Sequence, residues 1–180
     1  MIIFFGPVGA GKSVQGQFLG LRQGWQWIST GHLFRASKDP EVQAILASGA
    51  LMSSEKTQDL LAEVLDTTRS EEVILDGFPR KIEQAEWLVD HQAAYDYTLD
   101  LAIVIDVSKE EIRKRLALRG RPEDDPSIVE KRLDIYHTEV DPILDYLASH
   151  DMPIIHIDGG KKVGEIHDAI MDELTARQLG

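Results

Sequence analysis

Four residues near the start of the chain have the types and spacing of a phosphate-binding loop. Gly6, Gly11, Lys12 and Ser13 satisfy the pattern GxxxxGK[ST] and lie between an apolar run and a helical pattern, the context that this motif requires. Glycines let successive backbone N–H groups converge on an anion, and the positive end of the following helix points to the same place. The lysine supplies a compact charge for a phosphoryl group, and the serine hydroxyl can bind Mg²⁺. The segment therefore predicts a site for the phosphates of a nucleoside triphosphate.

A second group of polar residues follows the apolar run in "VILDGFPRKIEQ". Asp76 ends that run, and ligands of open parallel sheets bind at the carboxyl ends of the strands, so we expect Asp76 to hold Mg²⁺ or its water shell. Gly77 permits a close backbone approach, and Pro79 fixes a turn. The planar guanidinium of Arg80 suits a second phosphate group. A phosphate loop alone is shared by GTPases, ATPases and kinases, whereas this segment adds a place for a second phosphorylated ligand.

Positive charge gathers in one segment of a chain that is otherwise acidic. The formal net charge is −12, but "IRKRLALRGR" contains Arg113, Lys114, Arg115, Arg119 and Arg121. Two interpretations are open at this point. The cations can complement the carboxyl end of a solvated helix and pair with nearby carboxylates, or they can bind an anion. Arg115 and Arg119 are four residues apart and share one helix face, as two contacts to one ligand would require.

Apolar, β-branched runs alternate with helical patterns along the chain. The apolar runs are 2–5, 27–29, 73–75, 101–107 and 154–157. The helical patterns are 12–22, 54–69, 82–91, 109–118, 127–149 and 163–178. This alternation predicts an α/β fold with a doubly wound, five-stranded parallel sheet and helices on both faces. Residues 30–68 contain helical patterns without a strand pattern, which predicts a small helical insertion.

Composition and charge narrow the class of protein. A chain of 180 residues with 43% hydrophobic residues can bury one sizeable core, so we expect one domain. The net charge of −12 disfavours non-specific binding to nucleic acid or anionic lipid. The chain has no cysteine, which excludes disulfides and thiolate zinc sites and suits a reducing compartment. The sequence has no basic leader and no apolar run of about 18 residues, so we expect a cytoplasmic protein that does not enter a membrane.

Five segments occur in the order found in one known family. They are "GPVGAGKSVQ", "ISTGHLFR", "LDGFPRKIEQAE", "RLALRGR" and "VEKRLDIY", with a weaker match at "IDGGKKVGEI". Through them, nearly the whole chain resembles the adenylate kinase family of nucleoside monophosphate (NMP) kinases. The resemblance implies a P-loop NTPase-type α/β fold with a small helical NMP-binding insertion and a short lid. It divides a single kinase domain, residues 1–180, into a core at 1–29, 61–118 and 128–180, the insertion at 30–60 and the lid at 119–127.

The resemblance also implies roles for particular residues. ATP would be bound by Gly9, Ala10, Gly11, Lys12, Ser13, Val14, Arg115, Arg119 and Lys161. AMP would be bound by Thr30, Arg35, Ala50, Leu51, Met52, Gly77, Phe78, Pro79, Arg80, Gln84, Arg121 and Arg132. Catalysis would depend on Lys12, Arg80, Arg119, Arg121 and Arg132. Mg²⁺, held in part through water, would be bound by Ser13 and Asp76.

The reaction implied by the resemblance is reversible transfer of the γ-phosphoryl group of MgATP to AMP, which gives two ADP without a covalent enzyme intermediate. Gln84 favours AMP because its amide has both donors and an acceptor for the ring edge of adenine, whereas the UMP/CMP kinases usually have asparagine nearby. Two alternatives stay open: a kinase of UMP, CMP or another monophosphate, and a nucleotide-binding protein of this fold with weak or lost transfer. The implied partners are ATP and AMP with Mg²⁺ as cofactor, and we expect a monomer without structural zinc.

His32 departs from the family's pattern, which usually has aspartate at this position to support the water shell of magnesium. It can be a harmless surface imidazole, a hydrogen-bond donor to phosphate, or the sign of a shifted substrate or a reduced rate. The lid is too short for a zinc-bearing insertion and contains no cysteine. We expect it to be a flexible loop around Arg119 and Arg121.

Overall fold

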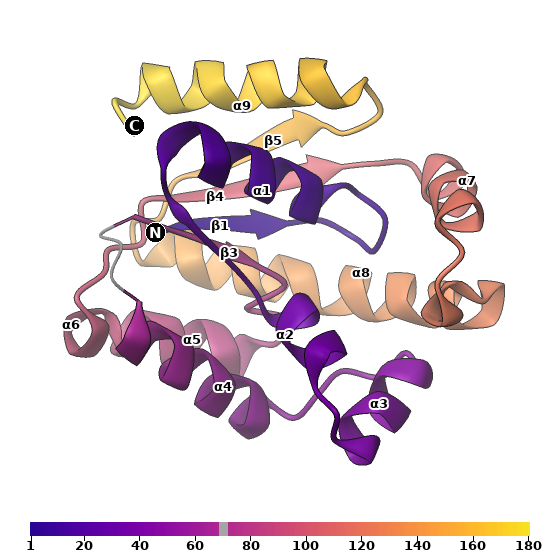
Figure 1. Ribbon diagram of the computed structural model, residues 1–180. Helices are drawn as coiled ribbons and strands as arrows, with labels where there is room; N and C mark the ends of the chain where they lie inside the picture. The colour runs from indigo at the N-terminus through magenta and orange to yellow at the C-terminus, as the bar shows by residue number, and fades with distance from the viewer. Residues whose placement is uncertain (69–71) are drawn as a thin grey trace.

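Five parallel strands form one sheet at the centre of the molecule (Figure 1). The computed structural model describes residues 1–68 and 72–180, the side chain of Pro122 excepted. The strands are β1 (Ile2–Phe5), β2 (Gln26–Ser29), β3 (Val73–Asp76), β4 (Leu101–Asp106) and β5 (Ile154–Asp158). Their order is β2-β3-β1-β4-β5, and all neighbouring pairs are parallel. The predicted α/β fold with a doubly wound, five-stranded sheet is confirmed.

Helices cover both faces of the sheet (Figure 1). Helices α1 (Lys12–Gln23) and α9 (Val163–Ala176) lie on one face, and α4 (Ser54–Thr67), α5 (Ile82–Asp90) and α8 (Pro126–Ser149) lie on the other. The short helix α6 (Gln92–Tyr95) follows α5. Helix α7 (Lys109–Arg119) packs against the first turns of α8 through a separate apolar cluster. No helix in the described ranges is both long and apolar enough to cross a membrane.

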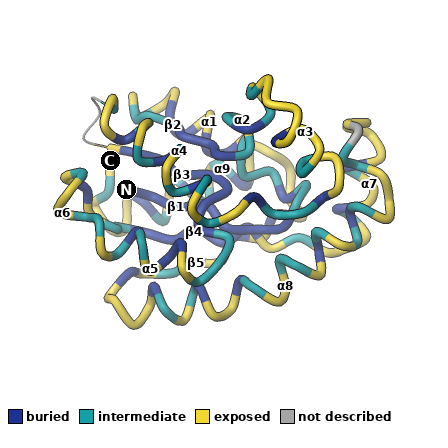
Figure 2. Tube along the Cα trace, turned by 90° about the horizontal axis from the view of Figure 1, so that it is seen from below, coloured by how far each residue is buried: buried dark blue, intermediate teal, exposed yellow. Residues whose placement is uncertain are grey.

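The three central strands β1, β3 and β4 are buried on both sides, as the dark blue centre of the trace in Figure 2 shows, except at Asp106, the last residue of β4. Along β1, Ile3 and Phe5 belong to the apolar cluster beneath α4, α5 and α8, whereas Ile2 and Phe4 belong to the cluster beneath α1 and α9. Successive side chains of a strand point to opposite faces. This explains why the sequence shows continuous apolar runs rather than an alternation of apolar and polar residues.

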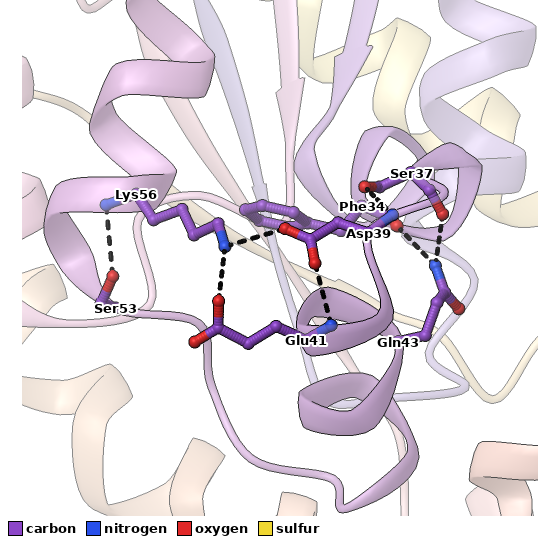
Figure 3. Close-up of polar contacts among 7 residues, drawn as sticks. All are labelled: Phe34, Ser37, Asp39, Glu41, Gln43, Ser53 and Lys56. Atoms are coloured by element: carbon purple, nitrogen blue, oxygen red, sulfur yellow. Dashed lines mark hydrogen bonds and ion pairs between the residues drawn. The ribbon is translucent and has the colours of Figure 1, made fainter.

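The segment between β2 and β3 forms the predicted helical insertion. Helices α2 (Thr30–Ala36) and α3 (Pro40–Ala47) have their own apolar cluster around Phe34, Val42 and Met52. The Nζ atom of Lys56 in α4 lies 3.4 Å from Asp39 and 3.5 Å from Glu41 at the start of α3 (Figure 3). These contacts hold the amino-terminal ends of α3 and α4 together. The expected boundary at residue 60 falls inside α4, and the division into core, insertion and lid stays a proposal.

Element ends differ from the sequence predictions by at most two residues where the structure describes them. The helix expected over 54–69 ends at Thr67, and Arg69 lies outside the described residues. The lid was expected to be a loop, but it contains a 3₁₀ helix, η1 (Pro122–Asp124), between α7 and α8. The reason is local, because the Asp124 carboxylate accepts a hydrogen bond from the backbone N–H of Arg121 at 3.0 Å and also pairs with Arg119.

Candidate active site

A cleft of about 710 Å³ opens where β1, β2 and β3 end at their carboxyl edge. Its walls come from the phosphate loop after β1, from Ser29 and Asp76 at the ends of β2 and β3, and from the lid. This is the edge at which parallel α/β sheets bind ligands. The positive side chains that line it are Lys12, Arg35, Arg80, Arg115, Arg119, Arg121, Arg132, Lys161 and Lys162. Nine of the 19 lysines and arginines of this strongly acidic protein therefore line one cavity.

The phosphate loop requires glycine at two points. Gly6 has φ +143°, and a Cβ atom there would lie 2.8 Å from the carbonyl oxygen of Ile105. Gly11 has φ +102° and immediately precedes α1. L-residues with side chains rarely adopt such backbone angles. The loop can therefore turn sharply from β1 and direct the N-terminus of α1 into the cleft.

Lys12 is buried at the base of the loop. Its Nζ atom donates hydrogen bonds to the carbonyl oxygens of Gly6 at 2.6 Å and Pro7 at 2.9 Å. Burial lowers the pKa of Lys12 from 10.5 to about 8; the nearby carboxylate of Asp76 opposes this shift, and neighbouring arginines add to it. An anionic phosphate group beside Nζ would favour the charged form.

Ser13 and Asp76 form the oxygen-rich corner of the cleft. The Ser13 hydroxyl donates a hydrogen bond to Oδ2 of Asp76 at 2.6 Å, and Asp76 is buried. A hydroxyl and a carboxylate are the hard oxygen donors that Mg²⁺ prefers, and Mg²⁺ usually takes its remaining ligands from phosphates and water. The two residues therefore fit a magnesium ion that arrives with nucleotide. No cluster of three His, Cys, Asp or Glu residues suited to a metal occurs in the part of the chain that the structure describes.

A second, smaller cavity of about 40 Å³ adjoins the cleft on the side of the insertion. It is lined by Thr30, Gly31, Phe34, Arg35, Leu46, Ala50, Leu51, Met52, Thr57, Gly77, Arg80, Gln84 and Arg132. Arg35, Arg80 and Arg132 line both spaces. Two ligands with phosphate groups, one in each space, would meet at these guanidinium groups.

Hydrogen bonds hold Arg80 at the junction of the two spaces. Its Nε atom donates to the Gly77 carbonyl oxygen at 2.7 Å, and its backbone N–H donates to Oε1 of Gln84 at 2.7 Å. The Thr30 hydroxyl donates to the same Gly77 carbonyl at 2.8 Å. Burial lowers the pKa of Arg80, and burial together with the charge of Arg80 lowers the pKa of Arg132 to about 10. Both guanidinium groups are poorly solvated, so phosphate oxygens would be strong partners for them.

The arginines of α7 and the lid line the cleft and are also paired with protein groups. Nε of Arg119 donates to Oδ2 of Asp124 at 2.8 Å, and Arg115 donates to Glu111 at 2.9 Å and to the carbonyl oxygen of Gly159 at 2.7 Å. These contacts confirm that both arginines pair with protein groups, and anion binding by the basic segment stays a prediction. Arg115 and Arg119 reach the same cleft from one helix, whereas Arg113 is exposed and pairs with Glu130 outside the cleft.

The sequence matches the family model described as adenylate kinase over residues 4–152. The chain belongs to the adenylate kinase family. It is 34% identical to an adenylate kinase of Mycolicibacterium smegmatis over 185 residues, which cover 99% of this chain and 96% of that protein. It is 33% identical to an adenylate kinase of Corynebacterium urealyticum, with 94% and 96% covered, and 38% identical to one of a Mycobacterium species, strain MCS, with 81% and 84% covered. Adenylate kinases transfer a phosphoryl group from ATP to AMP to give ADP.

The residues that the resemblance assigned to ATP all line the large cleft. Most of those assigned to AMP line the smaller cavity, but Arg121, Pro79 and Phe78 do not. Arg121 lines the cleft, and Pro79 lines a further apolar cavity of about 90 Å³ that includes Lys12, Arg80 and Arg132. The Phe78 side chain is 1% exposed and packs in the core against Trp87. The Phe78 ring therefore faces the core, and all of these roles stay predictions.

His32 is not among the residues that line the large cleft. Its imidazole is exposed and packs edge-on against the Trp27 ring, with ring centroids 5.7 Å apart. The cleft is lined by its neighbours Gly31 and Arg35 instead. Of the three interpretations of His32, the geometry favours the surface imidazole.

Sequence reasoning missed some of the lining residues. Thr57 lines the smaller cavity and is 4% exposed, and the large cleft is also lined by Gln15, Lys162, Val163 and Ile166. Thr57 shares the buried face of α4 with Leu61 and Leu65. The helical spacing of these three residues is the signal that could have identified Thr57 as an inward-facing polar residue.

Proposed function

We propose that this adenylate kinase binds MgATP in the large cleft and AMP in the adjoining cavity, and transfers the γ-phosphoryl group directly between them to give two ADP. One observation carries the proposal: Arg80 and Arg132 line both spaces. A site for one nucleotide alone would not require a phosphate-sized cavity on the far side of the same guanidinium groups. The proposal therefore depends on the arginines that line both spaces as well as on the phosphate loop.

On the donor side, the phosphate loop and the start of α1 would hold the ATP phosphates. Residues 9–14 line the cleft there, and backbone N–H groups with a helix N-terminus suit phosphate oxygens. Lys12 would follow the γ-phosphoryl group, and Arg119 would contact it from the lid. Arg115 would lie against the base. Ser13 and Asp76 would hold Mg²⁺, which would supply positive charge to the ATP phosphates.

On the acceptor side, Arg35, Arg80 and Arg132 would bind the AMP phosphate, since all three line the small cavity. Apolar side chains of the insertion would cover the base. Gln84 is 2% exposed and lines the same cavity, so its amide would face the ring edge of adenine. These contacts support AMP over pyrimidine monophosphates.

The chemistry that follows is an in-line displacement. An oxygen of the AMP phosphate attacks the γ-phosphorus, the bond from that phosphorus to the bridging oxygen breaks, and ADP leaves with the bonding electrons. The phosphate nucleophile is already ionised at neutral pH, so no general base is required. Cations positioned around the transferring group stabilise the charge that spreads over its oxygens.

Transfer in place of hydrolysis requires that water be excluded. Lys131 at the start of α8 donates a hydrogen bond to the Ser48 carbonyl of the insertion at 3.2 Å. A Cβ atom on Gly49 would lie 2.6 Å from Ile128 of α8. This close contact supports an insertion that covers the site from one side while the lid covers it from the other. We further expect a monomeric, cytoplasmic enzyme without structural zinc that binds neither nucleic acid nor membranes.

The test is ADP formation from MgATP with AMP, CMP, UMP, GMP and dTMP, each in turn. We expect AMP to give the highest kcat/KM, by about tenfold or more, because misplaced base-edge hydrogen bonds are costly. A higher kcat/KM with another monophosphate would identify a kinase of that nucleotide. Tight ATP binding without ADP formation would identify a nucleotide-binding protein that has lost transfer.

A further inference from the structure

The smaller cavity, in which we propose that AMP binds, is lined by Thr57, an uncharged polar residue to which the proposed function gives no role. Its walls are mainly apolar, and its uncharged polar side chains are Thr30, Thr57 and Gln84. We propose that the Thr57 hydroxyl accepts a hydrogen bond from the 6-amino group of the purine and, beside Gln84, selects AMP over purine monophosphates that lack this group. The inference rests on the proposed binding of AMP in this cavity.

The orientation of Gln84 leaves one N–H of the 6-amino group in need of an acceptor. Oε1 of Gln84 accepts a hydrogen bond from the backbone N–H of Arg80 at 2.7 Å. Because a backbone N–H can only donate, the amide oxygen is fixed toward Arg80 with one lone pair left, and the Nε2 group remains as a donor. Nε2 matches N1 of adenine, which is an acceptor, and the remaining lone pair of Oε1 can accept from one N–H of the exocyclic 6-amino group. The second N–H of that amino group still needs an acceptor.

Another acceptor near the small cavity is already in use. The carbonyl oxygen of Gly77 accepts from the Thr30 hydroxyl at 2.8 Å and from Nε of Arg80 at 2.7 Å, which occupies both of its lone pairs. Thr57 differs, because its hydroxyl donates its only proton to the Ser53 carbonyl oxygen at 2.8 Å. Toward a ligand it can therefore only accept. Within residues 1–68 and 72–180, no group donates a hydrogen bond to this oxygen.

The first turn of α4 is held firmly enough to present Thr57 in one position. The Ser53 hydroxyl caps the helix by accepting from the backbone N–H of Lys56, and the Lys56 ammonium contacts Asp39 and Glu41 in α3 (Figure 3). Thr57 lies on the buried face of the same helix, and its hydrogen bond to Ser53 fixes its rotamer. The hydroxyl is thus preorganised, so little conformational entropy is lost when a ligand binds.

An acceptor at this place distinguishes bases by the substituent at position 6. It can bind the amino group of adenine, and it repels the 6-oxo group of hypoxanthine or guanine, which is also an acceptor. A single hydrogen bond between neutral groups changes affinity by about threefold to tenfold. We therefore expect Thr57 to refine the selection that Gln84 begins, by a factor of this size.

The experiment compares AMP with purine riboside 5′-monophosphate, which has hydrogen in place of the 6-amino group and otherwise has the same structure. Equilibrium binding to the wild type and to Thr57→Val is measured by calorimetry, and turnover with MgATP is measured in parallel. Valine has nearly the same shape as threonine without the hydroxyl. We expect Thr57→Val to weaken AMP binding by about threefold to tenfold and to leave the binding of the analogue unchanged, so that the wild-type preference for AMP falls by the same factor.

Two further variants keep the result interpretable. Thr57→Ser retains the hydroxyl and loses a methyl group, and it should keep the preference for AMP even if its stability falls. Thr67→Val removes another hydroxyl that is bonded to α4 backbone carbonyls, but on an exposed residue at the far end of the helix, and it should change neither affinity. Equal weakening of both ligands by Thr57→Val, or no weakening of AMP, would overturn the inference. Loss of the binding preference in a protein without transfer activity would support the inference and contradict the proposed function.

Discussion

When MgATP binds at or above pH 8, the Lys12 side chain is expected to take up a proton. Nζ of Lys12 is buried and donates to two carbonyl oxygens of the phosphate loop, and burial lowers its pKa to about 8. The phosphates of ATP would lie beside this ammonium group and raise its pKa again, because an opposite charge favours the charged form. ATP therefore binds the protonated lysine more tightly than the neutral one.

The size of the effect follows from the pKa. Well below pH 8, Lys12 is mostly charged before ATP binds, so the titration of this group should not make the affinity of ATP depend on pH. At pH 9, about nine molecules in ten carry neutral Lys12, and protonation costs about 1.4 kcal/mol, which weakens ATP binding about tenfold. Proton uptake should rise from about 0.1 at pH 7 to about 0.5 at pH 8 and about 0.9 at pH 9.

Calorimetric titration with MgATP in two buffers of different ionisation enthalpy measures this uptake directly. Titration without AMP prevents turnover, and Lys12→Met removes the titrating group. The variant should bind ATP weakly at every pH, and its proton uptake should be lower than that of the wild type by the predicted amounts. Uptake near zero at pH 9 in the wild type, or equal uptake in both proteins, would refute the reasoning from burial and charge.

Three further predictions concern Arg119 at the start of the lid, Gly49 in the insertion and His32 in α2. Arg119→Ala should lower kcat by about 10³, the scale of charge-stabilising arginines in phosphoryl transfer, whereas Arg113→Ala, which changes a surface residue of the same helix, should retain most activity; equal losses in steady-state assays would argue against the cleft. Gly49→Ala should raise KM for AMP by about tenfold, because alanine at φ +71° costs about 1 kcal/mol or more and its Cβ meets Ile128; an unchanged KM would show that this contact is not needed for closure. His32→Asp should leave the dependence of rate on Mg²⁺ concentration unchanged, since the His32 imidazole lies outside the cleft; a lower Mg²⁺ requirement in the variant would restore a magnesium role to this position.

The central part of the site could be predicted from the sequence because it depends on local geometry. The phosphate loop needs glycine where the chain turns from β1 into α1, and Lys12 and Ser13 follow at a fixed spacing. Asp76 ends a fully buried strand, which places it at the ligand edge of any parallel sheet. The alternation of strands and helices gave the fold class for the same reason. The pairing of β1 with β3 and β4 depends on contacts distant in sequence, and no short motif encodes it.

Other features depend on packing that the sequence pattern alone does not show. Phe78 stands in a segment typical of monophosphate binding, yet its ring fills the core beside Trp87 because the turn after β3 directs it inward. The lid contains a 3₁₀ helix because the Asp124 carboxylate joins Arg119 and the backbone of Arg121. Thr57 resembles an ordinary helix residue until α4 is packed against the insertion. Such side chains become visible as site residues only when the cavity around them is known.

The fate of the γ-phosphoryl group tests the central claim most directly. The enzyme is incubated with Mg²⁺, AMP and ATP labelled at the γ-phosphate, and the label is followed into ADP, inorganic phosphate and protein. If both nucleotides meet at Arg80 and Arg132 with water excluded, nearly all transferred label will be found as the β-phosphate of ADP, and its formation will require AMP. Label released mainly as inorganic phosphate, or retained on the protein, would contradict direct transfer between two nucleotides in one cleft.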